Sequence, residues 1–180
     1  MAATASFLLG IALLTGCASP ESAQPVSRPG DQDTADCTFG GRTIAGLRDT
    51  FRQLSDQLNG IGPASARNDL ADVKARIAQG MLLANQVTTT IDPAVRKIGS
   101  PLIGDVYQDV SAAGKQLHDA LSQLSATLDG TRPPQGAADA IGTALDSLNG
   151  AITRMRTACP SVFPADAMPT PQGPRLAGAR

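Results

Sequence analysis

Four stretches of the chain carry apolar residues at alternating steps of three and four, which is the spacing of one face of an α-helix. They fall within residues 44–58, 70–91, 103–128 and 138–155. No stretch alternates apolar and polar residues as a half-buried strand does. At 180 residues the chain has room for one domain of ordinary size. We therefore predict an all-α protein in which four helices bury their apolar faces against one another.

Glycine and proline residues separate these four stretches. The expected breaks are residues 60–63, residues 92–93 followed by 99–101, and residues 130–134. Ser100 can cap the third helix, and Pro101 can occupy its first position. Because the connections are short, consecutive helices should run antiparallel, and we predict an up-down-up-down four-helix bundle over residues 37–159.

Two cysteines offer a test of that topology. Cys37 precedes the first expected helix and Cys159 follows the fourth, so both should lie at the same end of the bundle. In an oxidising compartment a disulfide between them is the expected state. Two free buried thiols or a metal pair are the alternatives, and a metal is disfavoured because no second Cys or His lies near either residue.

The segments on either side of the bundle have compositions that disfavour a packed core. Residues 17–36 contain three prolines and few apolar side chains, so we expect a flexible, disordered tether. Residues 160–180 contain five prolines and should form an extended or irregular tail.

A short apolar run over residues 7–14 ends in Leu14-Thr15-Gly16-Cys17, a pattern typical of an export signal that is too short to span a bilayer. These residues resemble the lipobox of bacterial lipoproteins, and the resemblance covers residues 1–17 only. It implies a signal peptide over residues 1–16, lipidation of Cys17 and an anchor on the extracytoplasmic face of the cell membrane. The alternative is an ordinary cleavable signal with an incidental cysteine. Residues 1–6 lack Lys and Arg, so either the free α-amine supplies the charge or translation starts upstream.

The sequence offers little for catalysis or metal binding. It contains one histidine, His118, and its only glutamate, Glu21, lies outside the expected helices, so the Glu pairs of carboxylate-bridged metal sites are missing. Asp105 and Asp109 share a helix face but are more simply explained as a solvated acidic surface. A net charge of −1 gives no electrostatic reason to expect nucleic acid. We predict a protein that is not an enzyme and uses no metal or cofactor.

Five basic residues should gather at the end of the bundle that holds the two cysteines: Arg42, Arg96, Lys97, Arg154 and Arg156. Because the tether from Cys17 is short, we expect this end to face the membrane, where these side chains could meet anionic headgroups. The alternative for Arg154 and Arg156 is that they complement the negative end of the fourth helix. Residues 60–63 and 129–134 would then form the surface offered to a protein partner.

Two classes of function follow from these features. We favour a lipid-anchored protein of the cell envelope whose helical domain acts by contact with a protein partner. The alternative is a module that binds a small apolar or lipidic ligand between its helices. The glycines inside the helices allow close helix approach, line a ligand cavity, or merely reflect base composition; they are Gly46, Gly80, Gly104, Gly114 and Gly142.

Overall fold

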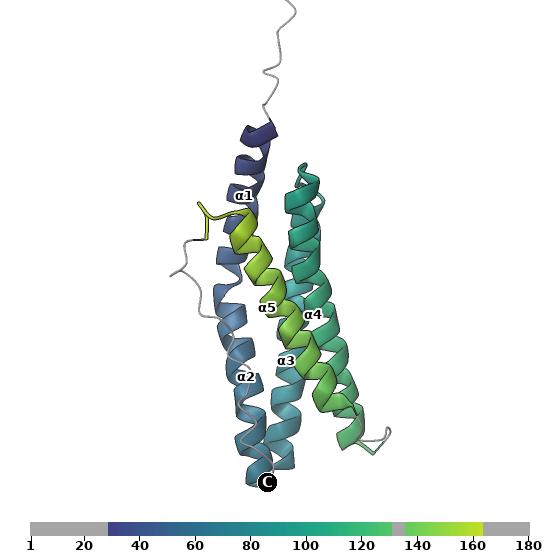
Figure 1. Cartoon of the computed structure of the whole chain (residues 1–180). Helices are drawn as coiled ribbons and strands as arrows, with labels where there is room; N and C mark the ends of the chain where they lie inside the picture. Colours follow the sequence, from purple (N-terminus) through teal and green to yellow (C-terminus); the bar gives the residue numbers. More distant parts are fainter. Residues whose placement is uncertain (1–28, 131–135, 164–180) are drawn as a thin grey trace, which may run out of the picture.

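The computed structural model describes residues 29–130 and 136–163, and within these ranges the chain forms five α-helices and no strand (Figure 1). The all-α prediction is confirmed. The helices are α1 (Pro29–Gly46), α2 (Arg48–Ala66), α3 (Leu70–Val95), α4 (Pro101–Leu128) and α5 (Ala137–Ala158).

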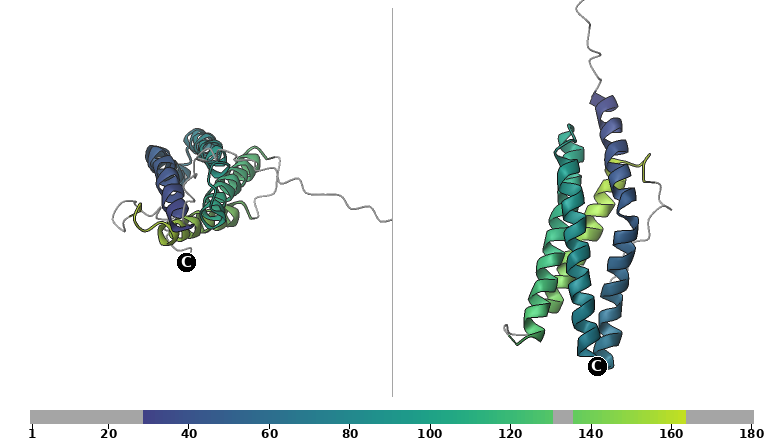
Figure 2. Two further views of the ribbon diagram at one scale, coloured as in Figure 1. Left: turned by 90° about the horizontal axis from the view of Figure 1, so that it is seen from above. Right: turned by 180° about the vertical axis from the view of Figure 1, so that it is seen from behind.

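The helices lie side by side around a shared interior. α1 and α2 follow one another along one side of the molecule, and α3, α4 and α5 then reverse direction in turn (Figure 1). α3 packs between α2 and α4, and α5 packs along α4 and crosses obliquely toward α1 (Figures 1 and 2). We call the end formed by residues 29–44, 91–107 and 152–163 the disulfide end. The opposite end, formed by residues 58–77, 117–130 and 136–145, is the distal end.

The first expected helix is divided between two helices in the structure. Leu47 has φ −92° and ψ 0°, which interrupts the helix for one residue between α1 and α2. Its amide donates to the carbonyl of Ile44 at 2.9 Å and its own carbonyl accepts from Phe51 at 2.9 Å, so hydrogen bonding continues across the interruption. The result is a nearly continuous rod whose apolar side stays buried.

Helix α1 begins at Pro29, inside the segment that we expected to be a tether. The structure therefore differs from the prediction over residues 29–36, which are helical. Pro29 suits a first helical position, because its fixed φ is helical and no hydrogen bond to its nitrogen is lost. The buried face of α1 includes Asp36, Cys37 and Gly40. These polar or small residues do not register as an apolar stripe, which is why the pattern missed the start of the helix.

The break expected at residues 60–63 does not occur, since α2 continues to Ala66. Pro63 falls in the last turn of α2, where its missing N–H removes a single hydrogen bond. A Cβ atom at Gly60 would overlap the guanidinium of Arg76 on α3, so the end of that flexible side chain would have to move. The turn comes instead at Asn68, whose φ of 56° is left-handed. Asp69 then caps α3 by accepting a hydrogen bond from the amide of Asp72 at 3.0 Å.

The break expected at residues 92–93 is also helical, because Pro93 lies in the last turn of α3. The break at residues 99–101 is present, and Pro101 is the first residue of α4 as predicted. Before α5, Gly136 adopts a left-handed φ of 88°, a backbone conformation in which a side chain is unfavourable. Residues 131–135, which cover most of the last expected break, lie outside the described residues.

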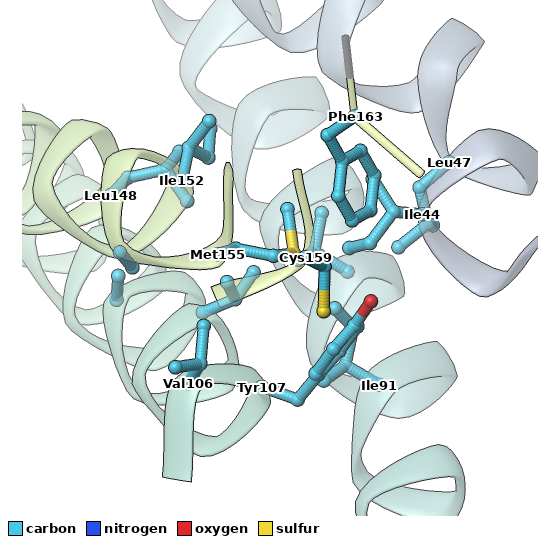
Figure 3. Close-up of a cluster of buried hydrophobic side chains, with 14 of the residues drawn as sticks. Ile44, Leu47, Ile91, Val106, Tyr107, Leu148, Ile152, Met155, Cys159 and Phe163 are labelled. Atoms are coloured by element: carbon cyan, nitrogen blue, oxygen red, sulfur yellow. The ribbon is translucent and has the colours of Figure 1, made fainter. Parts of the chain in front are cut away.

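Two apolar clusters fill the interior. The cluster at the disulfide end includes Ile44, Tyr107 and Met155 (Figure 3), and the cluster at the distal end includes Ile77 and Leu121. All five side chains are at most 1% exposed. Burying a large apolar side chain contributes about 1.5–3 kcal/mol, so both clusters are major sources of stability. In the described parts of the chain, no helix combines the length and apolar character that crossing a bilayer requires.

Candidate functional site

Cys37 and Cys159 join the first and last helices at the disulfide end. Cys37 lies in α1 and Cys159 directly follows α5, and their sulfur atoms lie at disulfide-bonding distance with Cα atoms 5.5 Å apart. That Cα separation is typical of a disulfide. Both residues are buried. The geometry is the one that the predicted pairing requires, and it ties the residues after α5 to α1.

Asp36, the neighbour of Cys37, connects α1 to the turn between α3 and α4. Its Oδ2 atom accepts hydrogen bonds from the backbone amides of Gly99 at 3.0 Å and Ser100 at 2.7 Å. Ser100 is at the N-cap position of α4, but its side chain makes no capping hydrogen bond. The Asp36 carboxylate thus supplies an acceptor at the positive end of the α4 dipole, where a negative charge is favourable.

Tyr107 packs directly beneath α1 and is completely buried (Figure 3). A Cβ atom on Gly40 would overlap the Tyr107 ring, so a glycine is needed for α1 to approach α4 this closely. The Tyr107 hydroxyl has no hydrogen-bond partner among the described residues. Burial raises the pKa of the phenol well above its usual value. Tyr107 therefore acts as an apolar packing group and offers no acid or base near neutral pH.

The five basic residues expected at this end have different surroundings. Arg96 and Lys97 are exposed in the turn after α3, and Arg42 is exposed on α1. Arg154 is engaged with Asp109 on α4, its Nη2 lying 2.9 Å and its Nε 3.0 Å from Oδ2. Arg156 is partly buried in the last turn of α5, the position at which a cation complements the helix dipole.

A polar cluster between α3 and α4 was missed by sequence reasoning. The Ser111 hydroxyl donates a hydrogen bond to Oδ1 of Asp92, and Lys115 Nζ lies 3.1 Å from Oδ2. The hydrogen bond from Ser111, followed by the charge of Lys115, lowers the pKa of Asp92. Because Ser111 is only 3% exposed, the cluster joins two helices and does not present a nucleophile to a substrate. The sequence did not predict this cluster because Asp92 precedes Pro93, and these two residues were expected to lie in a break between helices.

The remaining candidate groups for chemistry lie apart. His118 Nδ1 is 3.3 Å from Oδ1 of its neighbour Asp119, at a partly exposed position on α4. Asp105 is exposed, whereas Asp109 is committed to Arg154, so the two carboxylates do not form an acid–base pair. Over residues 29–130 and 136–163, no three His, Cys, Asp or Glu residues are grouped to hold a metal ion.

The helical glycines divide into two kinds. A Cβ atom would lie 3.0 Å from Thr88 Oγ1 at Gly114 and 3.1 Å from Leu121 Cδ1 at Gly80, so these two allow close helix approach. Gly46 and Gly142 face open space, and the nearest atom at Gly104 would be 3.9 Å away. The packing at these three positions does not require a glycine.

A hollow of about 240 Å³ lies between α4 and α5. Its lining includes charged and amide side chains together with small residues: Asp109, Ala112, Ala113, Gln116, Asp146, Ser147, Gly150 and Arg154. An apolar ligand pocket would need Leu, Val and Met side chains, which this lining does not contain.

Several expected features lie outside the described residues. They include Cys17 and the lipobox, the rest of the signal peptide over residues 1–16, residues 17–28 of the expected tether and residues 164–180 of the tail. Of the tail, Phe163 is described, and its ring is buried in the cluster at the disulfide end (Figure 3).

Comparisons of this chain with protein-family models, curated proteins and solved structures each found no match.

Proposed function

We propose that this chain is a lipid-anchored protein of the cell envelope whose helical domain acts by protein contact and not by catalysis. The observation that carries the proposal is the agreement between the lipobox residues 14–17 and the placement of Cys37 beside Cys159. A disulfide is stable in the compartment to which such a signal directs a protein. Two features at independent positions thus favour export.

We also propose that the described helices form an up-down-up-down four-helix bundle, with α1 and α2 together serving as its first member. The reversals of direction between α2, α3, α4 and α5 support this assignment (Figure 1). So does the packing of each of these helices against the next in sequence. In this bundle the tether is limited to residues 17–28, and the tail follows Phe163.

The packing of the interior supports a contact role over the binding of an apolar ligand. Leu121 and Thr88 occupy the space beside Gly80 and Gly114, where a cavity could otherwise lie. The hollow between α4 and α5 is lined by polar groups such as Asp146 and Gln116. The most conspicuous polar cluster, around Asp92 and Ser111, joins two helices. These features favour a protein that presents surfaces, with its interior closed.

The surface that we propose for the partner is the distal end. The chain enters α1 at the opposite end of the molecule, so the distal end extends away from an anchor at Cys17 (Figure 1). The turn at Asn68 is exposed there, and Leu70 beside it is 50% exposed. Asp129 and Gly130 are exposed at the end of α4. Residues 60–63, which were expected to form a loop of this surface, all lie within α2.

The proposal is tested by following the lipid on Cys17. Exported wild-type protein should enter the detergent phase on partitioning, and its N-terminal peptide should carry a diacylglyceryl mass on Cys17. Cys17→Ala should lose both the mass and the processing before residue 17. A Cys37→Ala/Cys159→Ala double variant is the matched control, because it removes two other thiols and should still be lipidated. Identical fractionation of wild type and Cys17→Ala as membrane-bound protein would contradict the proposal.

A further inference from the structure

We infer that the turn between α3 and α4 contacts an anionic lipid bilayer, with Leu102 entering the headgroup region beside Arg96 and Lys97. We call residues 96–102 the tip. The inference deepens the proposed function, on which it rests only for placing the protein next to a membrane. Of the five basic residues expected to face the membrane, the tip contains only Arg96 and Lys97, and it adds the apolar side chain of Leu102.

Leu102 gives the tip an apolar group that faces solvent. It lies in the first turn of α4 and is 62% exposed, one of three large apolar side chains in the described residues that are exposed to this degree or nearly so. Side chains in an α-helix lean toward its N-terminus, so Leu102 is directed toward the disulfide end of the molecule. Pro101 beside it is also exposed. An apolar side chain at the extremity of a helix pair can enter a bilayer interface without rearrangement of the core.

Arg96 and Lys97 give the tip its charge. Both are exposed, and neither lies at ion-pairing distance from a carboxylate among the described residues, whereas Arg154 is bound to Asp109. The charge of Arg96 does act on Asp92, because it contributes to lowering the pKa of that carboxyl. Cations that flank an apolar side chain suit the boundary between anionic headgroups and acyl chains. Asp31 and Asp33 lie at the start of α1 at this same end and oppose such a surface. Their removal should therefore strengthen the contact.

The tip is held in place by the rest of the disulfide end. The hydrogen bonds from Gly99 and Ser100 to Asp36 fix its backbone, and Ile98 packs against the apolar cluster. A surface that is already ordered loses little conformational entropy on binding. The chain also enters α1 at this end (Figure 1). Cys17 lies twelve residues before Pro29, so even a fully extended chain could separate them by only about 40 Å.

The absence of tryptophan from the sequence makes a direct test simple. Leu102→Trp places a single fluorophore at the tip, and Leu82→Trp is the matched control, because Leu82 is 65% exposed in the middle of α3. The exported, processed protein is combined with vesicles of phosphatidylcholine, with and without an equimolar share of phosphatidylglycerol. With the anionic vesicles, the Leu102→Trp protein should show blue-shifted emission that brominated acyl chains quench. The Leu82→Trp protein should show neither effect.

Charge variants in the Leu102→Trp background test the role of the cations. A basic residue near an anionic surface is worth about 1 kcal/mol, so the ratio of inserted to free tip should fall roughly fivefold for each cation removed by Arg96→Gln and Lys97→Gln. Arg48→Gln/Arg52→Gln on α2 changes the net charge equally and should leave the ratio unchanged. Asp31→Asn/Asp33→Asn should raise it.

Failure of the tip and failure of the anchor can be told apart on the same preparations, because the mass of the Cys17 peptide is measured on each. If the protein is lipidated but tryptophan emission does not shift at position 102, or shifts equally at positions 102 and 82, membrane contact by the tip is contradicted and the lipid anchor is not. A shift at position 102 alone in a protein that carries no lipid would support the tip and reject the anchor.

Discussion

The two ends of the molecule bury comparable apolar clusters but are reinforced by different means. At the disulfide end, the Cys37–Cys159 pair and the Asp36 hydrogen bonds join helices that are far apart in sequence, and both contacts are largely buried. At the distal end, the ion pair between helices, Lys74–Asp129, is exposed, with side chains 44% and 49% exposed, and the partly buried Arg76–Asp72 pair lies within α3. Exposed pairs contribute little because water and salt screen them.

The distal end therefore depends mainly on apolar packing. If the contacts at the disulfide end are removed, the two ends should become similar in stability, and local opening should no longer be confined to the distal end. The molecule would then lose the fixed geometry of the end that carries the tip. Substitutions at the two ends should change the free energy of unfolding by amounts that range from several kcal/mol to a few tenths of a kcal/mol.

The largest effect should come from removing the disulfide. Cys37→Ala/Cys159→Ala should lower the free energy of unfolding by about 4–5 kcal/mol, because a bond across 122 residues restricts the unfolded chain. Urea unfolding of wild type with and without reductant provides the measurement and its control, since reductant should destabilise the wild type alone. Equal stability of oxidised wild type and the double variant would show that the disulfide end does not depend on this bond.

A smaller effect should follow from filling the contact between α1 and α4. Gly40→Ala should cost about 1–3 kcal/mol, because the added methyl group overlaps the Tyr107 ring and forces the helices apart. Gly46→Ala in the same helix is the matched control. It faces open space and should be neutral or should stabilise the helix by up to about 1 kcal/mol. Thermal unfolding of both variants gives the comparison, and equal midpoints would contradict close approach at Gly40.

Asp36→Ala tests the polar connection between α1 and the tip. It leaves the amides of Gly99 and Ser100 without their acceptor, and Ser100 is buried, so we expect a loss of about 1–3 kcal/mol. Hydrogen exchange at the Ser100 amide should accelerate in this variant. Asp33→Ala, one turn earlier in α1, should leave that exchange rate as it is in wild type. Unchanged protection of the Ser100 amide from exchange in Asp36→Ala would show that this contact does not stabilise the disulfide end.

Part of this contrast could be predicted from the sequence. Apolar periodicity gave α3, α4 and α5, and the positions of the two cysteines placed them at a common end, because both signals depend on residue type and spacing alone. The start of α1 was missed because the first buried residues of this helix are Asp36, Cys37 and Gly40, which are polar or small. The prolines at positions 63 and 93 indicated breaks, yet both occur in last turns, where the lost hydrogen bond costs little.

The polar contacts of the site could not be predicted in the same way. Asp36 lies 63 and 64 residues from its partners, and no local pattern links a carboxylate in one helix to amides in a distant turn. The pairing of Arg154 with Asp109 likewise spans 45 residues and removes one cation from the expected basic group. Such contacts depend on the relative rotation and height of packed helices. Apolar periodicity identifies the buried face of a helix, but it does not determine how neighbouring helices are rotated or shifted relative to one another.

The Asp92–Ser111 contact predicts a pH dependence. Because the pKa of Asp92 is lowered in the folded protein, its contribution to stability is complete above the unfolded value of 3.8 and is lost as the pH falls through the lower folded value. Ser111→Ala should therefore be less stable than wild type near neutral pH, and the difference should shrink in acid. Ser122→Ala, at an exposed position of α4, should show no such trend. Thermal midpoints measured from neutral pH down to the acid range check this. A difference that stays constant with pH would contradict it.

The smallest effect should be found at the distal end, for the ion pair between Lys74 Nζ and Asp129 Oδ1 at 2.6 Å. A double-mutant cycle with Lys74→Gln and Asp129→Asn should give a coupling energy below about 0.5 kcal/mol, and added salt should reduce it further. The coupling energy can be compared with the effect of Asp36→Ala, because Lys74–Asp129 connects α3 to the end of α4, whereas Asp36 connects α1 to the start of α4. A coupling as large as the loss in Asp36→Ala would mean that polar contacts reinforce both ends equally. A small coupling leaves the distal helices held by apolar packing, and their amides should then exchange faster than those of the disulfide end.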